Sequence, residues 1–118
     1  MRQAIEKMEF HRYTAMPLVD DDGKYAGTIT EGDLLWHLKH TPDLKFRDTN
    51  KVQIKDIPKQ KYNKPVSIDS QIEDLVLLSI NQNFIPVVDD HEMFIGIVKR
   101  STIINYLYKN NCKINKIV

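Results

Sequence analysis

A polar stretch, Thr30-Glu31-Gly32-Asp33, separates a strand-like apolar run from an apolar run with helical spacing. Thr30 can accept a hydrogen bond from an orphan N–H group of the helix, and the Asp33 carboxylate complements the helix dipole. The same place also suits a ligand, because a helix N-terminus presents N–H donors that favour a phosphate. The stretch is therefore a helix cap, a binding site or both.

The chain as a whole has the composition of a soluble globular protein. It has 118 residues, of which 42% are hydrophobic, and a formal net charge of +1. A dedicated nucleic-acid binder normally carries a larger basic excess. The one cysteine, Cys112, excludes an intramolecular disulfide, and no apolar run approaches the ~20 residues of a membrane span. We therefore expect a cytoplasmic protein without a nucleic-acid or membrane partner.

The chain contains an internal repeat with an offset of 69 positions. Residues 16–29 align with residues 85–98, and the register continues without a gap into the apolar residues that follow. The identical residues are Pro17, Val19, Asp20, Asp21 and Gly27 in the first copy and Pro86, Val88, Asp89, Asp90 and Gly96 in the second. The repeat predicts two supersecondary units with the same plan.

Each copy predicts a helix, a β-hairpin and a second helix, in that order. The first helix of each copy has an apolar stripe at helical spacing, and the strands are short apolar runs. A polar turn joins the strands of each hairpin, and Gly23 in the first turn can adopt a positive φ. The predicted strands are 16–19, 25–29, 85–88 and 94–98, and the predicted second helices are 32–40 and 101–110.

The second copy has an opening segment that the first copy lacks. A strand-like run, Pro65–Ile68, precedes a helix for which Ser70 and Glu73 predict a capping box. The counterpart of Ile54 in the first copy would fall before Met1. We expect that the first copy starts late, through a trimmed chain or an internal start codon, or that it is a naturally shorter unit.

These patterns divide the chain into a first unit (1–40), a linker (41–53), a second unit (54–110) and a tail (111–118). The stretch 41–64 is locally basic, which is typical of a solvated surface and also suits the attraction of phosphates. Trp36 and Phe46 are able to stack a base, although packing in a core or a dimer is the simpler interpretation. His37 and His40 share a helix face with Asp33, but no further ligand cluster accompanies them, so no metal site is predicted.

The repeated motifs resemble the CBS domain, and two copies in tandem resemble a CBS pair, or Bateman module. The resemblance rests on apolar-Pro-apolar-Val-Asp at 16–20 and 85–89, and on Gly-x-x-Thr-x-x-Asp at Gly27, Thr30 and Asp33. It covers Met1 to about Lys109. It implies an α+β (α/β) fold of two pseudo-symmetric β-α-β-β-α units packed sheet to sheet, the first without its opening strand. Members of the family commonly pair into homodimers.

The resemblance also implies a ligand in the cleft between the units. We expect AMP, ADP or ATP, and S-adenosylmethionine and cyclic di-AMP rank below them. At the first site Asp33 would accept from the ribose hydroxyls, and Thr30 would bond the ribose or the α-phosphate. The wall for adenine would come from Ala15, Met16 and Pro17. Basic residues often precede the apolar-Pro pair in phosphate-binding members. Here Thr14 and Ala15 hold those positions, so a ligand with one phosphate or none is favoured.

The second site is degraded by the same comparison. Its residues are Ile85, Pro86, Lys99, Arg100 and Thr102. Lys99 stands where Thr30 stands, and Thr102 replaces Asp33, so the carboxylate for the ribose is missing. Lys99 and Arg100 either hold a phosphate or a partner's carboxylate at the helix N-terminus, or are solvated surface.

Two functions follow as hypotheses. The first is a regulatory module, not an enzyme, that binds an adenine nucleotide between its units and signals occupancy to an effector protein by a conformational shift. The alternative is a structural homodimerisation module with vestigial clefts. Neither requires a cofactor, and no arrangement of residues predicts a catalytic site.

Overall fold

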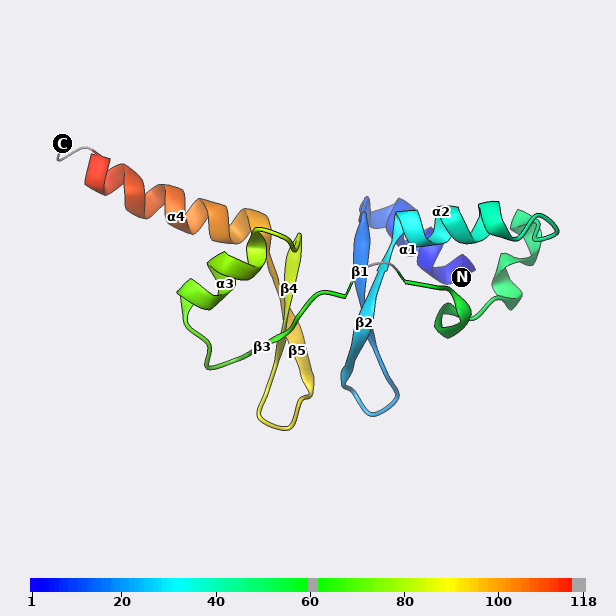
Figure 1. The fold of residues 1–118 in the computed structure, drawn as a ribbon, viewed down its shortest axis with the longest axis horizontal. Coiled ribbons are helices and arrows are strands. Elements are labelled where there is room, and N and C mark those ends of the chain that lie inside the picture. Colours follow the sequence, from blue (N-terminus) through cyan, green and yellow to red (C-terminus); the bar gives the residue numbers. More distant parts are fainter. Residues whose placement is uncertain (60–61, 116–118) are drawn as a thin grey trace. The chain divides into compact units, whose positions relative to one another are not determined.

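The computed structural model describes residues 1–59 and 62–115, with side-chain surroundings as far as residue 110. The chain forms two compact units: Met1–Leu18 with Ala26–Tyr62, and Val19–Tyr25 with Asn63–Val118. Their helices and strands are labelled in Figure 1. Residues 60–61 of the basic stretch and 116–118 of the predicted tail lie outside the described residues. In the described part of the chain, none of the helices has the length and apolar character of a membrane span.

The first unit contains one hairpin with a helix on each side of it in the sequence. Its elements are α1 (Arg2–His11), β1 (Ala15–Val19), β2 (Tyr25–Thr30) and α2 (Glu31–His40), then two short 3₁₀ helices, η1 (Phe46–Lys51) and η2 (Ile54–Asp56). Among the described residues β1 and β2 form a sheet of two strands, as the missing opening segment predicts. α1 packs against both α2 and η1.

The second unit has the opening strand that the first one lacks. Its elements are β3 (Val66–Ser67), α3 (Ile72–Ser79), β4 (Phe84–Val88), β5 (Phe94–Lys99) and α4 (Arg100–Asn115). β3 pairs with β4 in parallel, Val66 opposite Val87, and β4 pairs with β5 antiparallel. α3 packs against β4, and α4 packs against β5. The α+β class and the predicted elements are confirmed, although α4 continues beyond Asn110, where the sequence predicts its end.

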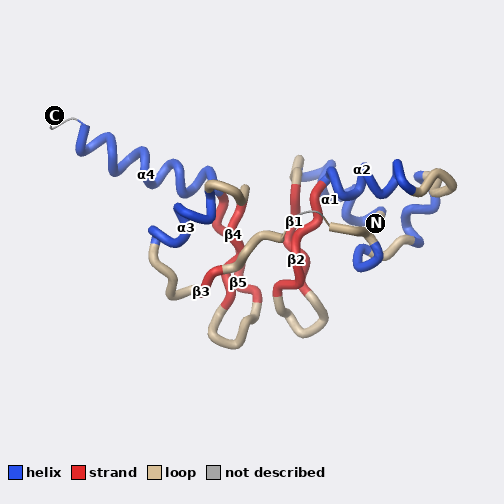
Figure 2. The backbone as a smooth tube through the Cα atoms, viewed as in Figure 1, coloured by secondary structure: helices blue, strands red, loops and turns tan. Residues whose placement is uncertain are grey.

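The turns of the two hairpins, which are tan loops in Figure 2, contain the same hydrogen bonds. In the first turn the Asp20 carboxylate accepts from the N–H groups of Asp22 and Lys24, both at 2.9 Å. In the second turn Asp89 accepts in the same way from residues 91 and 93, also at 2.9 Å. The aspartate shared by the two copies therefore holds its turn, which is the ordinary use of this side chain in a loop.

The tips of the two turns also bond to each other. The Phe94 N–H donates to the Gly23 carbonyl over 2.8 Å, and Lys24 pairs with Met93 as an antiparallel bridge. The rings of Tyr25 and Phe94 stack with centroids 6.4 Å apart. Gly23 has the positive φ that the sequence predicts, 83°. These contacts place the first turn in the second compact unit.

The core of the first unit includes residues that come after α2. The buried side chains of this core are Met1, Met8, Ile29, Leu34 and Ile57, and Leu44, Val52 and Ile54 pack against them. Arg2 fixes the same segment, since its Nε donates to the Thr49 hydroxyl over 2.8 Å and its Nη2 donates to the Phe46 carbonyl. The Arg2 guanidinium also lies 4.1 Å from the centroid of the Phe46 ring. We call residues 44–57 the cover segment, because side chains from this segment pack against the core of the first unit.

One predicted cap was placed one residue too early. α3 begins after Gln71, whose N–H donates to the Asp74 carboxylate at 3.3 Å, so the pair is Gln71 and Asp74 rather than Ser70 and Glu73. Ser70 is used in the preceding turn, where its N–H donates to the Ser67 carbonyl at 2.9 Å. The helix start moves by one residue because this turn competes for Ser70.

Candidate functional site

Thr30 and Asp33 form a reciprocal capping box at the start of α2. The Asp33 N–H donates to the Thr30 hydroxyl over 3.1 Å, and the Thr30 N–H donates to Asp33 Oδ2 over 2.9 Å. Thr30 has extended backbone angles, as an N-cap residue does. The predicted cap is confirmed, and Asp33 rather than Glu31 is the acidic residue that closes it, because it stands three positions after the N-cap.

The Asp33 side chain is 2% exposed, an unusually deep position for a carboxylate. It nevertheless lines a cleft of about 350 Å³ in the first unit, together with Trp36, His37, His40 and Pro58. A helix cap and a wall of a cleft are thus combined in one side chain.

The other residues predicted for the first site lie on the approach to β1 and in its first half. Thr14 is exposed, and its carbonyl accepts from the Glu31 N–H over 3.0 Å, which joins the start of β1 to the start of α2. Ala15, Met16 and Pro17 are half-buried in β1. The Met16 side chain packs against the core of the first unit.

The residues predicted for the second site belong to the second unit. Ile85 is fully buried and Pro86 is less than 2% exposed, both in β4. Lys99 is exposed at the end of β5, and Thr102 is exposed in the first turn of α4. Arg100 is tied to the loop before β4, because its Nε donates to the Gln82 carbonyl over 3.1 Å and its N–H donates to the Asn83 carbonyl over 3.0 Å.

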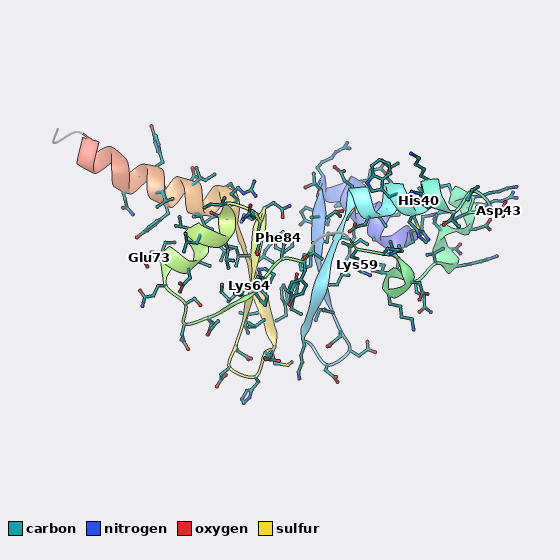
Figure 3. The ribbon with its side chains drawn as sticks, in the orientation of Figure 1. His40, Asp43, Lys59, Lys64, Glu73 and Phe84 are labelled. Carbon is teal, nitrogen blue, oxygen red and sulfur yellow. The ribbon has the colours of Figure 1, made fainter. Side chains whose placement is uncertain are left out.

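A buried polar network in the second unit was not predicted. The Asn63 amide is 4% exposed and donates to Asn83 Oδ1 at 3.3 Å and to the Phe84 carbonyl at 3.1 Å. The Gln82 side chain accepts from the Lys64 N–H at 2.8 Å and donates to the Lys64 carbonyl at 3.1 Å. Lys64 and Phe84 are labelled in Figure 3. Three successive amides, Asn81-Gln82-Asn83, are the only trace of this network in the sequence.

No group of three or more His, Cys, Asp and Glu side chains in the described part of the chain is arranged to hold a metal ion. The groups around the cleft of the first unit are one carboxylate (Asp33), two imidazoles (His37 and His40) and one indole (Trp36).

A comparison with protein-family models gives the family. The model of the CBS domain matches residues 1–40 and 54–109. The chain belongs to the CBS domain family. The two matched segments contain one copy each of the internal repeat, so the chain carries a tandem CBS pair.

Solved structures of CBS proteins share the fold. A CBS domain protein from Streptococcus pneumoniae is 26% identical, with a TM-score of 0.78 over 92% of this chain and 73% of that one. CbpB from Listeria monocytogenes, in complex with c-di-AMP, is 19% identical, with a TM-score of 0.74 over 92% of this chain and 80% of that one. OpuCA from Staphylococcus aureus is 23% identical, with a TM-score of 0.66 over 91% and 84%. A comparison with curated protein sequences found no match.

Proposed function

We propose that this CBS pair is a regulatory module that binds an adenosine-containing nucleotide at Asp33 and passes its occupancy to an effector protein. The observation that carries the proposal is the Asp33 carboxylate, which lines a cleft at the N-terminus of α2. A carboxylate there accepts from ribose hydroxyls, while the positive end of the helix dipole favours a nearby phosphate. The role is binding and not catalysis, in keeping with the family.

The ligand class is an adenine nucleotide: AMP, ADP, ATP or cyclic di-AMP. Two solved structures with a similar fold are complexes of CbpB with c-di-AMP, so we rank this compound equally with the mononucleotides as a candidate ligand. Thr14 and Ala15, before the apolar-Pro pair, carry no cation, and this favours a ligand with few phosphate charges. Binding shifts the equilibrium between arrangements of the chain by no more than the difference in the ligand's affinity for them.

The test is thermal unfolding of the chain with AMP, ADP, ATP, S-adenosylmethionine and cyclic di-AMP, with GTP as the comparison for the base. A ligand present at a hundred times its Kd stabilises the folded chain by about 2.7 kcal/mol. For a domain of this size each kcal/mol raises Tm by several degrees, about 4–8 °C. The absence of a shift with every adenosine compound contradicts the proposal.

A matched pair of variants assigns the site. Asp33→Asn keeps an acceptor for the Thr30 N–H but removes the charge, and each hydrogen bond to a charged group contributes about 1.5–3 kcal/mol. We expect this variant to lose most of the ligand-induced shift. Asp74→Asn changes the carboxylate at the same position of the α3 cap, which is exposed, and should keep the shift. Equal losses in the two variants would place the ribose elsewhere.

A second function, a homodimerisation module, is favoured by one surface. α3 and α4 expose large apolar side chains: Leu77 (68%), Ile80 (70%), Ile104 (55%) and Tyr108 (68%). Large apolar side chains exposed on two helices that pack together are typical of an interface. Sedimentation of the chain tests it: Leu77→Lys should shift a dimer to monomer, whereas Phe10→Lys, at an exposed residue of α1, should not. A monomeric parent chain rejects this function.

A further inference from the structure

The cleft beside Asp33 extends along one face of α2. Asp33, Trp36, His37 and His40 follow the spacing that brings side chains to one face of a helix, and Pro58 lines the cleft from the chain that follows η2. The proposed function uses Asp33 alone, so the aromatic part of this cleft has no role yet. Its volume, about 350 Å³, lies within the usual range for a small-molecule site, about 300–1,000 Å³.

The Trp36 indole lies beside the first turn of α2 and remains accessible. It is 46% exposed, a large apolar surface to leave in water. Its Nε1 lies beside Gly32, where an added Cβ would be 3.7 Å away. The Lys39 ammonium lies 5.5 Å from the ring centroid, within the range of a cation–π contact. An oriented, exposed indole in a cleft is suited to stacking on a planar ring.

The opposite wall of the cleft is also fixed. The Lys59 ammonium donates to the carbonyls of Ile54 and Ile57 over 2.7 and 2.9 Å, which closes the backbone around Pro58. Ile57 itself is 2% exposed in the core of the first unit. Figure 3 labels Lys59 and His40, which belong to this unit. A wall anchored in this way needs little reorganisation when a ligand enters.

The second repeat serves as an internal comparison for these side chains. At the positions of Asp33, Trp36, His37 and His40 it carries Thr102, Asn105, Tyr106 and Lys109. The equivalent helix of the second repeat, α4, therefore forms without a tryptophan, so the formation of this helix does not require one. The first repeat has both the carboxylate and the indole, and the second repeat has neither, as expected for two parts of one site.

We propose that Trp36 stacks on the adenine base of the nucleotide whose ribose Asp33 binds, with Pro58 as the facing wall. Trp36 lies three residues after Asp33, about 4.5 Å further along the helix axis, so the two side chains can contact adjoining parts of one nucleoside. The inference rests on the proposed function and adds the residue that recognises the base.

The test uses the fluorescence of Trp36, the one tryptophan of the chain. AMP, ADP, ATP and cyclic di-AMP are titrated with excitation at the red edge of the indole band, where adenine does not absorb, and Tm is measured on the same samples. Ribose 5-phosphate serves as the probe without a base, and free N-acetyltryptophanamide controls for collisional quenching. We expect saturable quenching with an adenine compound that raises Tm, and none with ribose 5-phosphate.

The outcomes separate the two proposals. A rise in Tm without quenching overturns the stacking on Trp36 and leaves the proposed function intact. No rise in Tm and no quenching with any of these compounds overturns both. Saturable quenching with a rise in Tm supports both.

Variants measure the contribution of the ring by calorimetry, which needs no tryptophan. Stacking of a base on an aromatic side chain corresponds to a loss of about 5- to 150-fold in affinity when the ring is removed. We expect such a loss for Trp36→Leu and a loss of less than about tenfold for Trp36→Phe, which keeps an aromatic face. Phe10→Leu, at an exposed aromatic residue of α1, should leave the affinity unchanged. Equal affinities of Trp36→Leu and the parent chain overturn the inference.

Discussion

The two CBS repeats agree in their turns and differ in their helices. Asp20 and Asp89 accept the same two backbone hydrogen bonds, at the same 2.9 Å. By contrast, Met8 of α1 is 6% exposed, whereas Leu77, its counterpart in α3, is 68% exposed. The cover segment accounts for this difference, since it packs against α1 and contributes Ile57 to the core. The residues that the two repeats share thus maintain the fold, and the residues that differ determine which helix faces are buried or exposed in each repeat.

The start of the second helix shows the same division. Glu31 and Arg100 donate their N–H groups to the equivalent carbonyls of Thr14 and Asn83, both at 3.0 Å. The carboxylate of Asp33 has no counterpart at Thr102. The backbone connection is therefore common to the repeats, and the acidic group belongs to the first repeat alone.

The largest effect should come from removing the cover segment's anchor. Ile57→Ala creates a cavity in a core where the side chain is 2% exposed, and should lower the free energy of unfolding by about 2–5 kcal/mol. Ile68→Ala makes the same kind of change at a residue that is 56% exposed, and should stay within about 0.5 kcal/mol. Urea unfolding of the two variants measures both. Similar small losses would show that the cover segment is not part of the core.

The next effect concerns the buried amide network of the second repeat. Asn63→Ala removes a buried amide that bonds Asn83 and Phe84, and should cost about 1–3 kcal/mol. Asn50→Ala, at an exposed amide, is the matched control. If both variants unfold at the urea concentration of the parent chain, the network does not hold the opening segment to β4.

A smaller effect should distinguish the two helix starts. Thr30→Ala removes the hydroxyl that accepts from the Asp33 N–H, and loss of an N-cap costs about 1 kcal/mol. Lys99→Ala changes the equivalent residue of the second repeat, which is exposed, and should have almost no effect. Denaturation of the two variants side by side checks this, and an equal loss would contradict the assignment of the cap to one repeat.

The smallest effect should appear at the third position after each turn aspartate. Gly23 has φ 83° and Glu92, its counterpart, has φ 65°, so both adopt the left-handed conformation that a side chain disfavours. Glu92→Gly should stabilise the chain by about 0.5 kcal/mol, since relief of strain is partly offset by the flexibility of glycine in the unfolded chain. Gly23→Ala, the reverse comparison, should destabilise it, because the left-handed φ disfavours a side chain and an added Cβ would lie 2.5 Å from the Met93 Cε atom. Changes of the same sign, measured by thermal unfolding, would contradict the shared turn geometry.

The repeated parts of the fold and the opening strand of the second repeat were predictable from the sequence, whereas the cover segment was not. The hairpins and their flanking helices follow from periodicity and from matching residues, which are local signals. The cover segment has no period and was interpreted as a linker followed by the start of the second unit. Its role depends on long-range contacts such as that of Arg2 with Thr49, which no local pattern encodes.

The candidate site divides in the same way. The cap formed by Thr30 and Asp33 was predictable, since it depends on residues three apart in the sequence. The cleft was not, because Pro58 reaches α2 only through the folded cover segment. The capping box of α3 was displaced because Ser70 had a competing bond in its turn. The ligand-binding roles of Met16, Pro17 and the second-repeat residues stay predictions.

The bond between the two turn tips has a consequence for how the chain folds. Each turn closes a loop of a few residues and can form early, whereas joining Phe94 to Gly23 closes a loop of roughly seventy residues, at an entropic cost of about 4 kcal/mol. Contacts so distant in sequence form late and slow the overall rate. The two repeats therefore do not complete their folding independently. A chain emerging from the ribosome holds its first turn unpaired until the second hairpin has been made.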